Sequence, residues 1–281
     1  MEIGLYIIMF VLGACLGSFL CCQARRLRLR DTQKGKRRKK PLGSRSVCLH
    51  CRKQLKWYDN LPIASWLILR GKCRYCHKKI GLAEILSELG TGLAFIAVAF
   101  GFGQLISSTS IIAIFRSADI INIASFAITL IFALTLIFLA IYDGLYGELP
   151  SLCLTLSIIC AIITLTLRTW ASLSVSPFAP DLIVQPLLAT LILGGLYLAL
   201  YLISKGKWVG DGDWLLGTAI ALALGTPWLA LITLFLANLT ACLVMYPIVK
   251  SKRTHKIHFG PFLVIAFFIT YAFAHFFTIM I

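Results

Sequence analysis

Residues 120–150 read IINIASFAITLIFALTLIFLAIYDGLYGELP, and this stretch decides the fold class. Residues 120–142 carry no charge, and about 20 apolar residues in a helix are enough to cross the hydrocarbon core of a membrane. The run ends at Asp143, so a carboxylate lies where an apolar segment meets water. An ionisable group at that depth is costly, and it therefore indicates a functional site.

The rest of the chain has the same character, since 59% of its residues are hydrophobic and only 14% are charged. This composition is typical of a polytopic membrane protein and excludes an ordinary soluble domain. Helices are expected because a helix satisfies its own backbone hydrogen bonds in lipid. The predicted fold class is an all-α polytopic membrane protein with about eight transmembrane helices. The predicted spans are 3–22, 86–103, 120–142, 151–167, 184–203, 212–227, 228–249 and 259–281.

The positive charges predict the orientation of these helices. Most of the 27 lysines and arginines lie in residues 23–83, and with eight spans only Arg116 and Arg168 fall on the opposite side. The positive-inside rule makes the basic side cytoplasmic and puts both termini outside. The loops 143–150 and 205–213 then also lie on the cytoplasmic side.

The net charge of +16 also suggests nucleic-acid binding, but most of it lies in one loop that includes the basic 31–43 stretch. Basic residues beside a membrane helix more often set topology and contact anionic lipids. Membrane lipids are therefore expected as partners, and nucleic acid is not.

Four cysteines in this loop predict a metal site. Cys48 and Cys51 form one CxxC pair, and Cys73 and Cys76 form a second. Four thiolates at this spacing are typical of a closed, structural zinc site, and disulfides do not persist in the cytoplasm. Alone, the quartet equally suits a nucleic-acid-binding zinc ribbon. The apolar stretch 57–71 between the pairs could pack on the membrane face or on the helix bundle.

A second carboxylate, Asp213, ends the motif Gly210-Asp211-Gly212-Asp213. Two carboxyls a few ångströms apart share one proton, so Asp143 and Asp213 are candidates for a catalytic acid/base pair. Gly210 and Gly212 would let a substrate backbone approach, or would let Asp213 start a helix. The alternative is that both aspartates only cap helices or pair with lysines. Asp211 is favoured as a solvated cap residue, and His258 is assigned no role.

The motifs together resemble the type IV prepilin peptidase family over most of the chain. The matching segments are Gly17-Ser18-Phe19-Leu20, the cysteine pairs with residues 57–62 and 65–73 between them, Glu88-Leu89-Gly90-Thr91-Gly92, Asp143 with Leu149-Pro150, and residues 210–213. The chain departs from the family pattern at Leu215, where many members carry lysine, and at Ser151, where aspartate is common.

The resemblance implies a membrane aspartyl endopeptidase of the bacterial inner membrane. Such an enzyme removes the short basic leader of prepilins or pseudopilins at the cytoplasmic face, here with Asp143 and Asp213, and often methylates the new amino terminus with S-adenosylmethionine. A basic leader would be drawn to acids, so Glu84, Glu88, Glu148 and Asp211 are expected to include leader contacts. The implied domains are a first transmembrane helix (1–22), a zinc-binding loop (23–83) and a protease domain (84–281).

Two other classes remain open on the residues alone. A proton-coupled transporter would use the aspartates as a proton relay and would cleave nothing. A membrane-tethered zinc ribbon would bind nucleic acid with strong salt dependence and would tolerate loss of Asp143.

Overall fold

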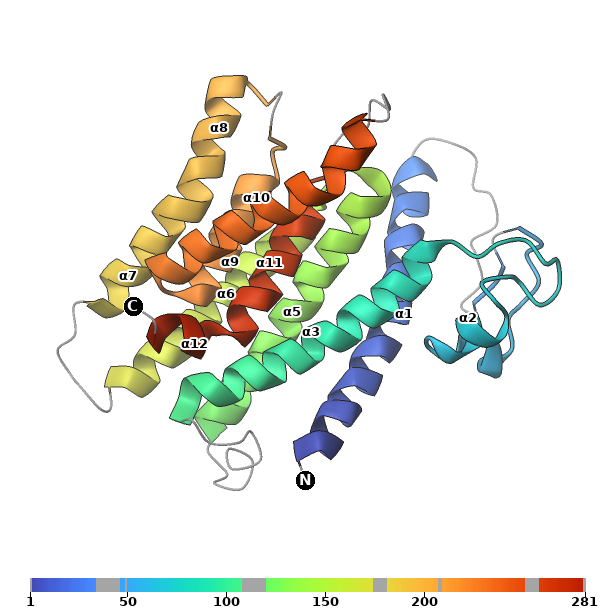
Figure 1. Cartoon of the computed structure of the whole chain (residues 1–281), viewed down its shortest axis with the longest axis horizontal. Coiled ribbons are helices and arrows are strands. Elements are labelled where there is room, and N and C mark those ends of the chain that lie inside the picture. Colours follow the sequence, from blue (N-terminus) through green and yellow to red (C-terminus); the bar gives the residue numbers. More distant parts are fainter. Residues whose placement is uncertain are drawn as a thin grey trace. The chain divides into compact units, whose positions relative to one another are not determined.

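The computed structural model describes residues 2–33, 46–48, 50–107, 120–173, 181–206, 209–250 and 258–279. Most of the basic 31–43 stretch lies outside the described residues. The described residues form helices joined by short connections, with two isolated β-bridges and no β-strand (Figure 1). The all-α class is confirmed.

Among the described residues, six helical segments are long and apolar enough to cross a membrane. They are α1 (Glu2–Gln33), α3 (Leu82–Ser107), α5 (Ile120–Tyr146), α6 (Ser151–Leu173), the continuous run of α7 (Asp181–Thr190), π-helical η2 (Leu191–Gly195) and α8 (Leu196–Ser204), and α10 (Pro227–Lys250). Two shorter apolar helices, α9 (Asp213–Leu224) and α11 (Gly260–Ala272), occupy the other two predicted positions, and α12 (Ala274–Ile279) follows α11. At 1.5 Å per residue, the 12 residues of α9 reach only about 18 Å, less than the hydrocarbon thickness.

The chain divides into two compact units, residues 3–96 and 97–281. In the first unit, α1 packs against the start of α3 through glycines. A Cβ atom on Gly13 would lie 2.6 Å from the carbonyl oxygen of Thr91, and one on Gly17 would lie 2.5 Å from that of Ser87. Such close contact between backbones is the usual role of small residues where membrane helices meet.

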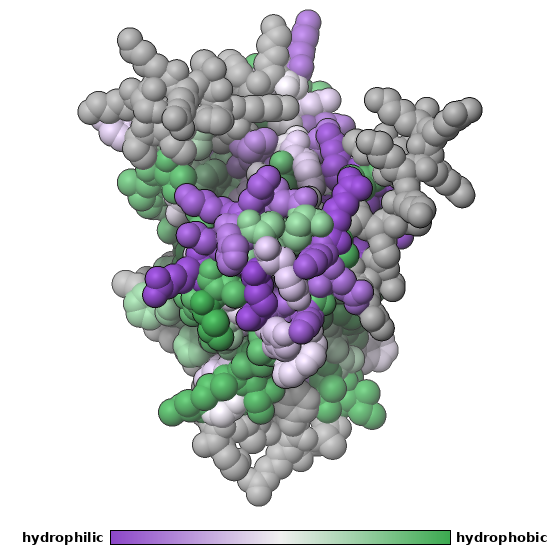
Figure 2. All heavy atoms as spheres, turned by 90° about the vertical axis from the view of Figure 1, so that its right-hand side faces the viewer, coloured by the Kyte–Doolittle hydropathy of each residue, from purple (hydrophilic) through white to green (hydrophobic). Residues whose placement is uncertain are grey.

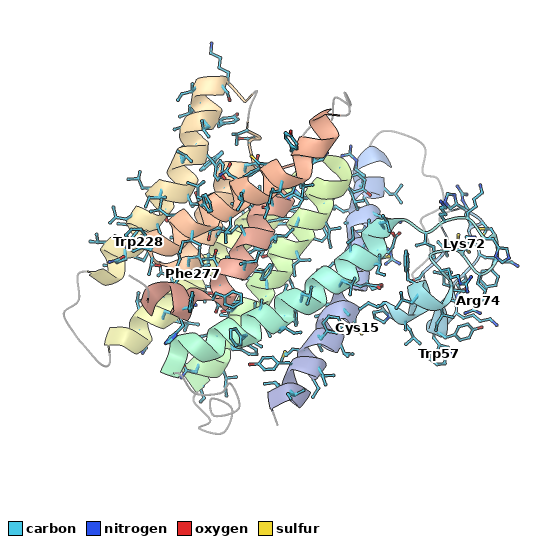
Figure 3. The ribbon with its side chains drawn as sticks, viewed as in Figure 1. Cys15, Trp57, Lys72, Arg74, Trp228 and Phe277 are labelled. Carbon is cyan, nitrogen blue, oxygen red and sulfur yellow. The ribbon has the colours of Figure 1, made fainter. Side chains whose placement is uncertain are left out.

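Helix α1 continues beyond the predicted end of the first span at residue 22 and reaches Gln33. Its second part is rich in arginine and leucine, which are good helix formers, so the helix has no reason to stop where the apolar run ends. The loop 46–80 follows in the same unit and contains η1 (Trp57–Asn60) and α2 (Ala64–Ile68). Hydrophilic side chains gather over this loop (Figure 2), and Figure 3 labels Trp57, Lys72 and Arg74 on it and Cys15 on α1.

In the second unit, the short helix α9 is the centre of the packing. It contacts α6, α7, η2, α8, α10 and α11, and its Leu216 and Ile220 are fully buried. Around it, α5 packs against α6 and α11, and α10 lies beside α11 (Figure 1). Most residues of α9 are buried by other helices and none is exposed, so α9 can be shorter than the membrane and still be stable.

Arg168 on α6 binds the C-terminal end of α9. Its guanidinium donates to the carbonyl oxygen of Ala223 at 3.0 Å and to the hydroxyl of Tyr271 at 3.3 Å. The last carbonyls of a helix have no partner within the helix, and a cation there is favourable. One of the two arginines outside the predicted cytoplasmic side thus caps the end of α9 opposite Asp213.

Candidate active site and metal centre

Asp143 lies in the last turn of α5 and is only 6% exposed. A negative charge is unfavourable at the C-terminal end of a helix. A second helix offsets this cost, because the Asp143 Oδ2 accepts a hydrogen bond of 3.0 Å from the backbone N–H of Gly260, the first residue of α11. A Cβ atom on Gly260 would come within 2.8 Å of that oxygen, so the approach depends on glycine.

Asp213 is the first residue of α9 and is 8% exposed. Its backbone N–H donates to the carbonyl oxygen of Gly210 at 3.3 Å, and its Oδ2 accepts from the Gly210 N–H at 2.9 Å. Residues 210–213 therefore form a turn, which the backbone N–H and the side chain of Asp213 both stabilise. Both carboxylates are thus buried and accept a backbone N–H, which comes from the first residue of α11 for Asp143 and from the turn before α9 for Asp213.

Contacts in the second unit bring the two aspartates into one region. A Cβ atom on Gly212 would lie 2.6 Å from Leu149 Cδ1, so the GxGD turn packs directly against the connection that follows α5. Asp143 precedes this connection and Asp213 follows Gly212, so the two aspartates lie on the two segments that this contact joins. Between them in sequence, Asp211 is exposed to solvent, and so is Glu148.

His258 also belongs to this region, although the sequence analysis gave it no role. Its Nδ1 lies 3.7 Å from the Asp143 Oδ1. Gly147, with a φ of +67°, leaves room for the imidazole, since a Cβ atom there would collide with the His258 ring. The neighbouring Phe259 packs on the Tyr197 ring, with centroids 5.3 Å apart, and so holds this segment in place.

The two remaining acids predicted to contact substrate lie in the first unit. Glu84 forms an ion pair with Arg25 at 2.5 Å. Glu88 is buried, and its Oε2 accepts a hydrogen bond of 2.7 Å from the backbone N–H of Ile63. Both side chains therefore have partners within the chain, and their contact with a leader stays a prediction.

The four predicted metal ligands, Cys48, Cys51, Cys73 and Cys76, come together. Their sulfur atoms all lie within 4.8 Å of one another, and those of Cys48 and Cys76 are 3.9 Å apart. Zn–S bonds of about 2.3 Å in a tetrahedron require sulfur–sulfur distances of about 3.8 Å. The cluster therefore fits a zinc ion with little movement, and all four positions of the metal are filled by the protein.

The two CxxC pairs sit in nearly identical turns. The backbone bonds Cys48 N–H to Lys53 carbonyl and Cys73 N–H to Lys78 carbonyl are both 2.9 Å, and bridges pair Val47 with Gln54 and Lys72 with Lys79. The residues after the second cysteines, Arg52 and His77, both have left-handed backbones, with φ of 56° and 54°. The loop thus contains an internal repeat of the cysteine turn, which the sequence analysis did not find.

The first turn also favours the thiolate. Burial alone would raise the pKa of the Cys48 thiol, but hydrogen bonds from the backbone N–H groups of Cys51 and His50 lower that pKa to about 7. A metal binds the thiolate and not the thiol, so these N–H groups prepare the site for a cation.

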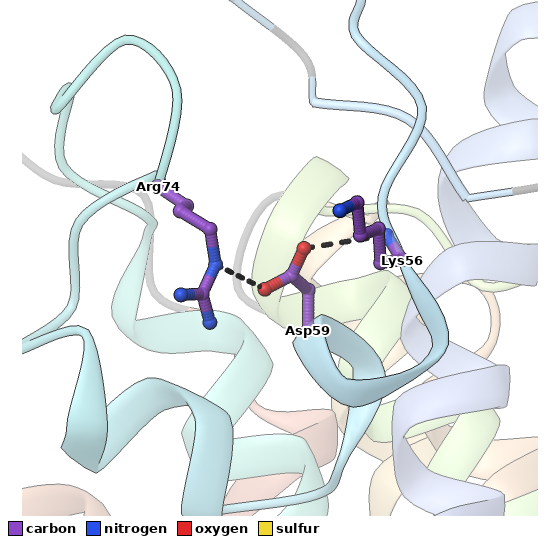
Figure 4. A network of polar contacts seen from close by, with 3 residues as sticks. All are labelled: Lys56, Asp59 and Arg74. Atoms are coloured by element: carbon purple, nitrogen blue, oxygen red, sulfur yellow. Dashed lines mark hydrogen bonds and ion pairs between the residues drawn. The ribbon is translucent and has the colours of Figure 1, made fainter.

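A polar network connects η1 to the second cysteine turn (Figure 4). The buried carboxylate of Asp59 accepts from Arg74 Nε at 2.8 Å and from the backbone N–H of Lys56 at 3.2 Å. The Arg74 guanidinium also lies over the Tyr58 ring, 5.0 Å from its centroid. This network holds the aromatic segment between the two turns, where the loop has little apolar core.

Comparisons with known proteins agree with this arrangement. The sequence model of the family described as Bacterial Peptidase A24 N-terminal domain matches residues 11–102. A prepilin leader peptidase/N-methyltransferase of Myxococcus xanthus is 40% identical over 97 residues, which are 34% of this chain and 27% of that protein. Proteins of the same name from Aeromonas hydrophila and Dichelobacter nodosus are each 28% identical, over 79% and 80% of this chain and 69% and 70% of their own lengths. No solved structure matches.

The match therefore covers only about a quarter of the Myxococcus protein but more than two thirds of the other two. The residues that match the family model, 11–102, include the tetracysteine loop, and the two longer alignments cover about four fifths of the chain. With its multi-pass helical fold and its four-cysteine centre, the chain is similar over most of its length to prepilin leader peptidase/N-methyltransferases, and residues 11–102 match the N-terminal domain of the bacterial A24 peptidases.

Proposed function

We propose that this chain is a membrane aspartyl endopeptidase that removes the basic leader of type IV prepilins or pseudopilins, with Asp143 and Asp213 as its catalytic pair. One observation carries the proposal: in a single compact unit, two buried aspartates are each held by a backbone N–H at or just before the start of a short helix. A role in helix capping alone would not explain why Asp143 is buried. It would also not explain why this acid lies at the C-terminal end of α5, where a negative charge is unfavourable. The names of the relatives supply the substrate class.

The mechanism follows from two carboxyls that share one proton. The ionised member takes a proton from a water molecule, and the resulting hydroxide attacks the scissile carbonyl carbon. The protonated member donates to the carbonyl oxygen as the tetrahedral intermediate forms. When the C–N bond breaks, the proton taken from water passes to the leaving amine, and the other carboxyl takes back the proton that it gave to the carbonyl oxygen. The backbone bonds to Gly260 and Gly210 fix one oxygen of each carboxyl and so hold the pair in place.

The proposal includes the orientation and the cofactors. The active site lies at the cytoplasmic face of the bacterial inner membrane, as the lysine and arginine distribution predicts, and both termini lie outside. Zinc on Cys48, Cys51, Cys73 and Cys76 is structural. Methylation of the new amino terminus with S-adenosylmethionine is proposed from the names of the relatives, and no described residue is assigned to it. The division into 1–22, 23–83 and 84–281 stays a prediction.

The direct test uses the purified full chain in lipid vesicles with a synthetic prepilin. Cleavage is followed by the change in substrate mass, and the new amino terminus is sequenced. A cut at the end of the basic leader supports the proposal. A chain that retains its fold and zinc and cuts no prepilin would leave transport as the better account of the aspartates.

Charge reversal at the exposed acids tests how the basic leader is recognised. Asp211→Lys and Glu148→Lys are each expected to raise KM for a basic leader several-fold, because an exposed charge contact contributes about 0.2–1 kcal/mol and reversal also adds repulsion. KM for a leader whose lysines are replaced by glutamine should not change. An equal rise in KM for the two leaders would show that these acids do not recognise the positive charge of the leader.

His258 is expected to act as a positioning residue for Asp143. His258→Ala should lower kcat about ten-fold, a barrier change of about 1.4 kcal/mol, while KM stays the same. His258→Gln, which keeps a polar side chain of similar size beside the Asp143 carboxylate, should restore most of this loss. A kcat in His258→Ala equal to that of the wild type would reduce the imidazole to a packing role.

A further inference from the structure

We propose that the cysteine loop, residues 46–80, is a membrane-docking platform whose apolar edge enters the headgroup region of an anionic lipid leaflet. The inference concerns the first compact unit and does not depend on the peptidase activity. Three independent observations support it: an exposed apolar cluster, an excess of positive charge, and the depth at which the loop is fastened to the membrane helices.

The loop exposes four large apolar side chains. Trp57 is 77% exposed, Ile68 74%, Leu67 58% and Leu61 43%. They belong to η1, to α2 and to the short connection between these two helices. Apolar side chains exposed together in so small a module indicate an interaction surface. Tryptophan in particular favours the interface between lipid and water, where its ring is buried and its N–H stays hydrated.

The same loop is strongly basic. Its described acid, Asp59, is already paired with Arg74, so it neutralises little of the surface. Besides Arg74, the loop exposes the cations Arg52, Lys53, Lys56, Arg70, Lys72, Lys78 and Lys79. Lysine and arginine side chains near an anionic bilayer favour binding to it. A surface with apolar side chains beside many cations matches the chemistry of an anionic leaflet.

Hydrogen bonding fixes the depth of the loop. The backbone N–H of Ile63 donates to Glu88, and the Glu88 Cα lies 3.0 Å from where a Cβ atom on Gly17 would be. Ile63 therefore lies within the length of one glutamate side chain of the contact between Gly17 and Glu88. Arg25, the first cation of α1, comes eight residues later, which is about 12 Å further along the helix. The apolar edge of the loop thus lies where α1 is still an uncharged membrane helix.

Figure 3 agrees with this depth, since Trp57 lies near the level of Cys15 on α1 and Lys72 lies further toward the arginine end of that helix. The hydrogen bond between Ile63 and Glu88 also determines the local backbone conformation. Ile63 has a φ of +61°, a strained conformation for a β-branched residue. The bond to the buried Glu88 holds the chain in this conformation, so the loop is fixed beside the membrane helices.

The bilayer fits these observations better than other partners. A nucleic acid would contact the cations but would leave Trp57 and Ile68 exposed to water. A second copy of the chain would cover the apolar residues but would bring two sets of cations together. Only a lipid leaflet meets both groups of side chains at the depth of Gly17.

The test measures the position of Trp57 in the full-length zinc-loaded protein. The chain is placed in nanodiscs whose lipids include phosphatidylglycerol, and the emission of Trp57→Phe is subtracted from that of the wild type. Lipids brominated near the headgroup end of the acyl chains should quench most of this difference emission, and aqueous acrylamide should quench little. Trp170, exposed at the far end of α6, provides a matched control through Trp170→Phe.

Two outcomes would overturn the proposal. Quenching by acrylamide alone would place Trp57 in water, and quenching by neither agent would mean that protein covers it. If Trp57→Phe loses zinc or aggregates, Ile68→Trp provides a second reporter through its added emission. Replacing phosphatidylglycerol by neutral lipid should reduce the bromine quenching, and an unchanged signal would contradict the role of the cations.

Discussion

Asparagine at Asp143 or at Asp213 is expected to lower kcat for leader cleavage by about 10³-fold or more, with KM nearly unchanged. General acid–base catalysis by a positioned side chain contributes about 10²–10⁴-fold, and here each carboxyl has two proton transfers to perform. Asparagine keeps the size of aspartate, and its carbonyl oxygen can still accept the N–H of Gly260 or Gly210. The loss therefore reports the titrating group and not the fold.

Asp211→Asn is the matched control, because Asp211 lies in the same turn but is exposed. It should keep kcat near the wild-type value. The double variant Asp143→Asn/Asp213→Asn should be little worse than either single variant, because groups that act as a unit are not additive. If either single variant cleaved prepilin at close to the wild-type rate, the assignment of the pair would be wrong. Thermal unfolding and zinc content would confirm that the inactive variants are folded.

The sequence predicted the helical fold well because lipid leaves the backbone few alternatives. Uncharged runs gave the position of each helical segment, and six of these are long enough to span. Their lengths were less predictable. α1 continues for eleven residues past its apolar run, since hydropathy does not end a helix when good helix formers follow. α9 is short because it is buried among other helices, which hydropathy does not reveal.

The candidate site was predictable only where its residues form local motifs. Asp143 and Asp213 stood out because charge is rare in apolar segments, and the cysteines stood out by their spacing. Gly260 and His258 gave no such signal. Gly260 is 117 residues from the carboxylate that it contacts, and this contact depends on how α5 and α11 pack. The hydrogen bond between Glu88 and Ile63 could not be predicted either, because it also depends on how two distant segments pack. Glu88 itself was among the predicted site residues.

Removal of zinc is expected to unfold the loop 46–80 while the helices of the second unit remain folded. The loop has almost no core of its own, since Asp59, Gly71 and Cys73 are its buried residues among those described. In such modules the free energy of metal binding, about 10–16 kcal/mol for structural zinc, is also the free energy of folding. Cys73→Ser, which removes the most buried ligand, should therefore have the same effect as a strong chelator.

Hydrogen exchange and metal analysis together measure this effect. The wild type should hold one zinc per chain, and both chelated protein and Cys73→Ser should lose it together with the amide protection of the two cysteine turns. Cys242→Ser, at an exposed cysteine of α10, should keep both. Protection in α9 and α11 should not change, because their packing partners lie in the second unit. A loop that kept its protection without metal would have to be held by the Asp59–Arg74 network and the bond from Ile63 to Glu88 alone.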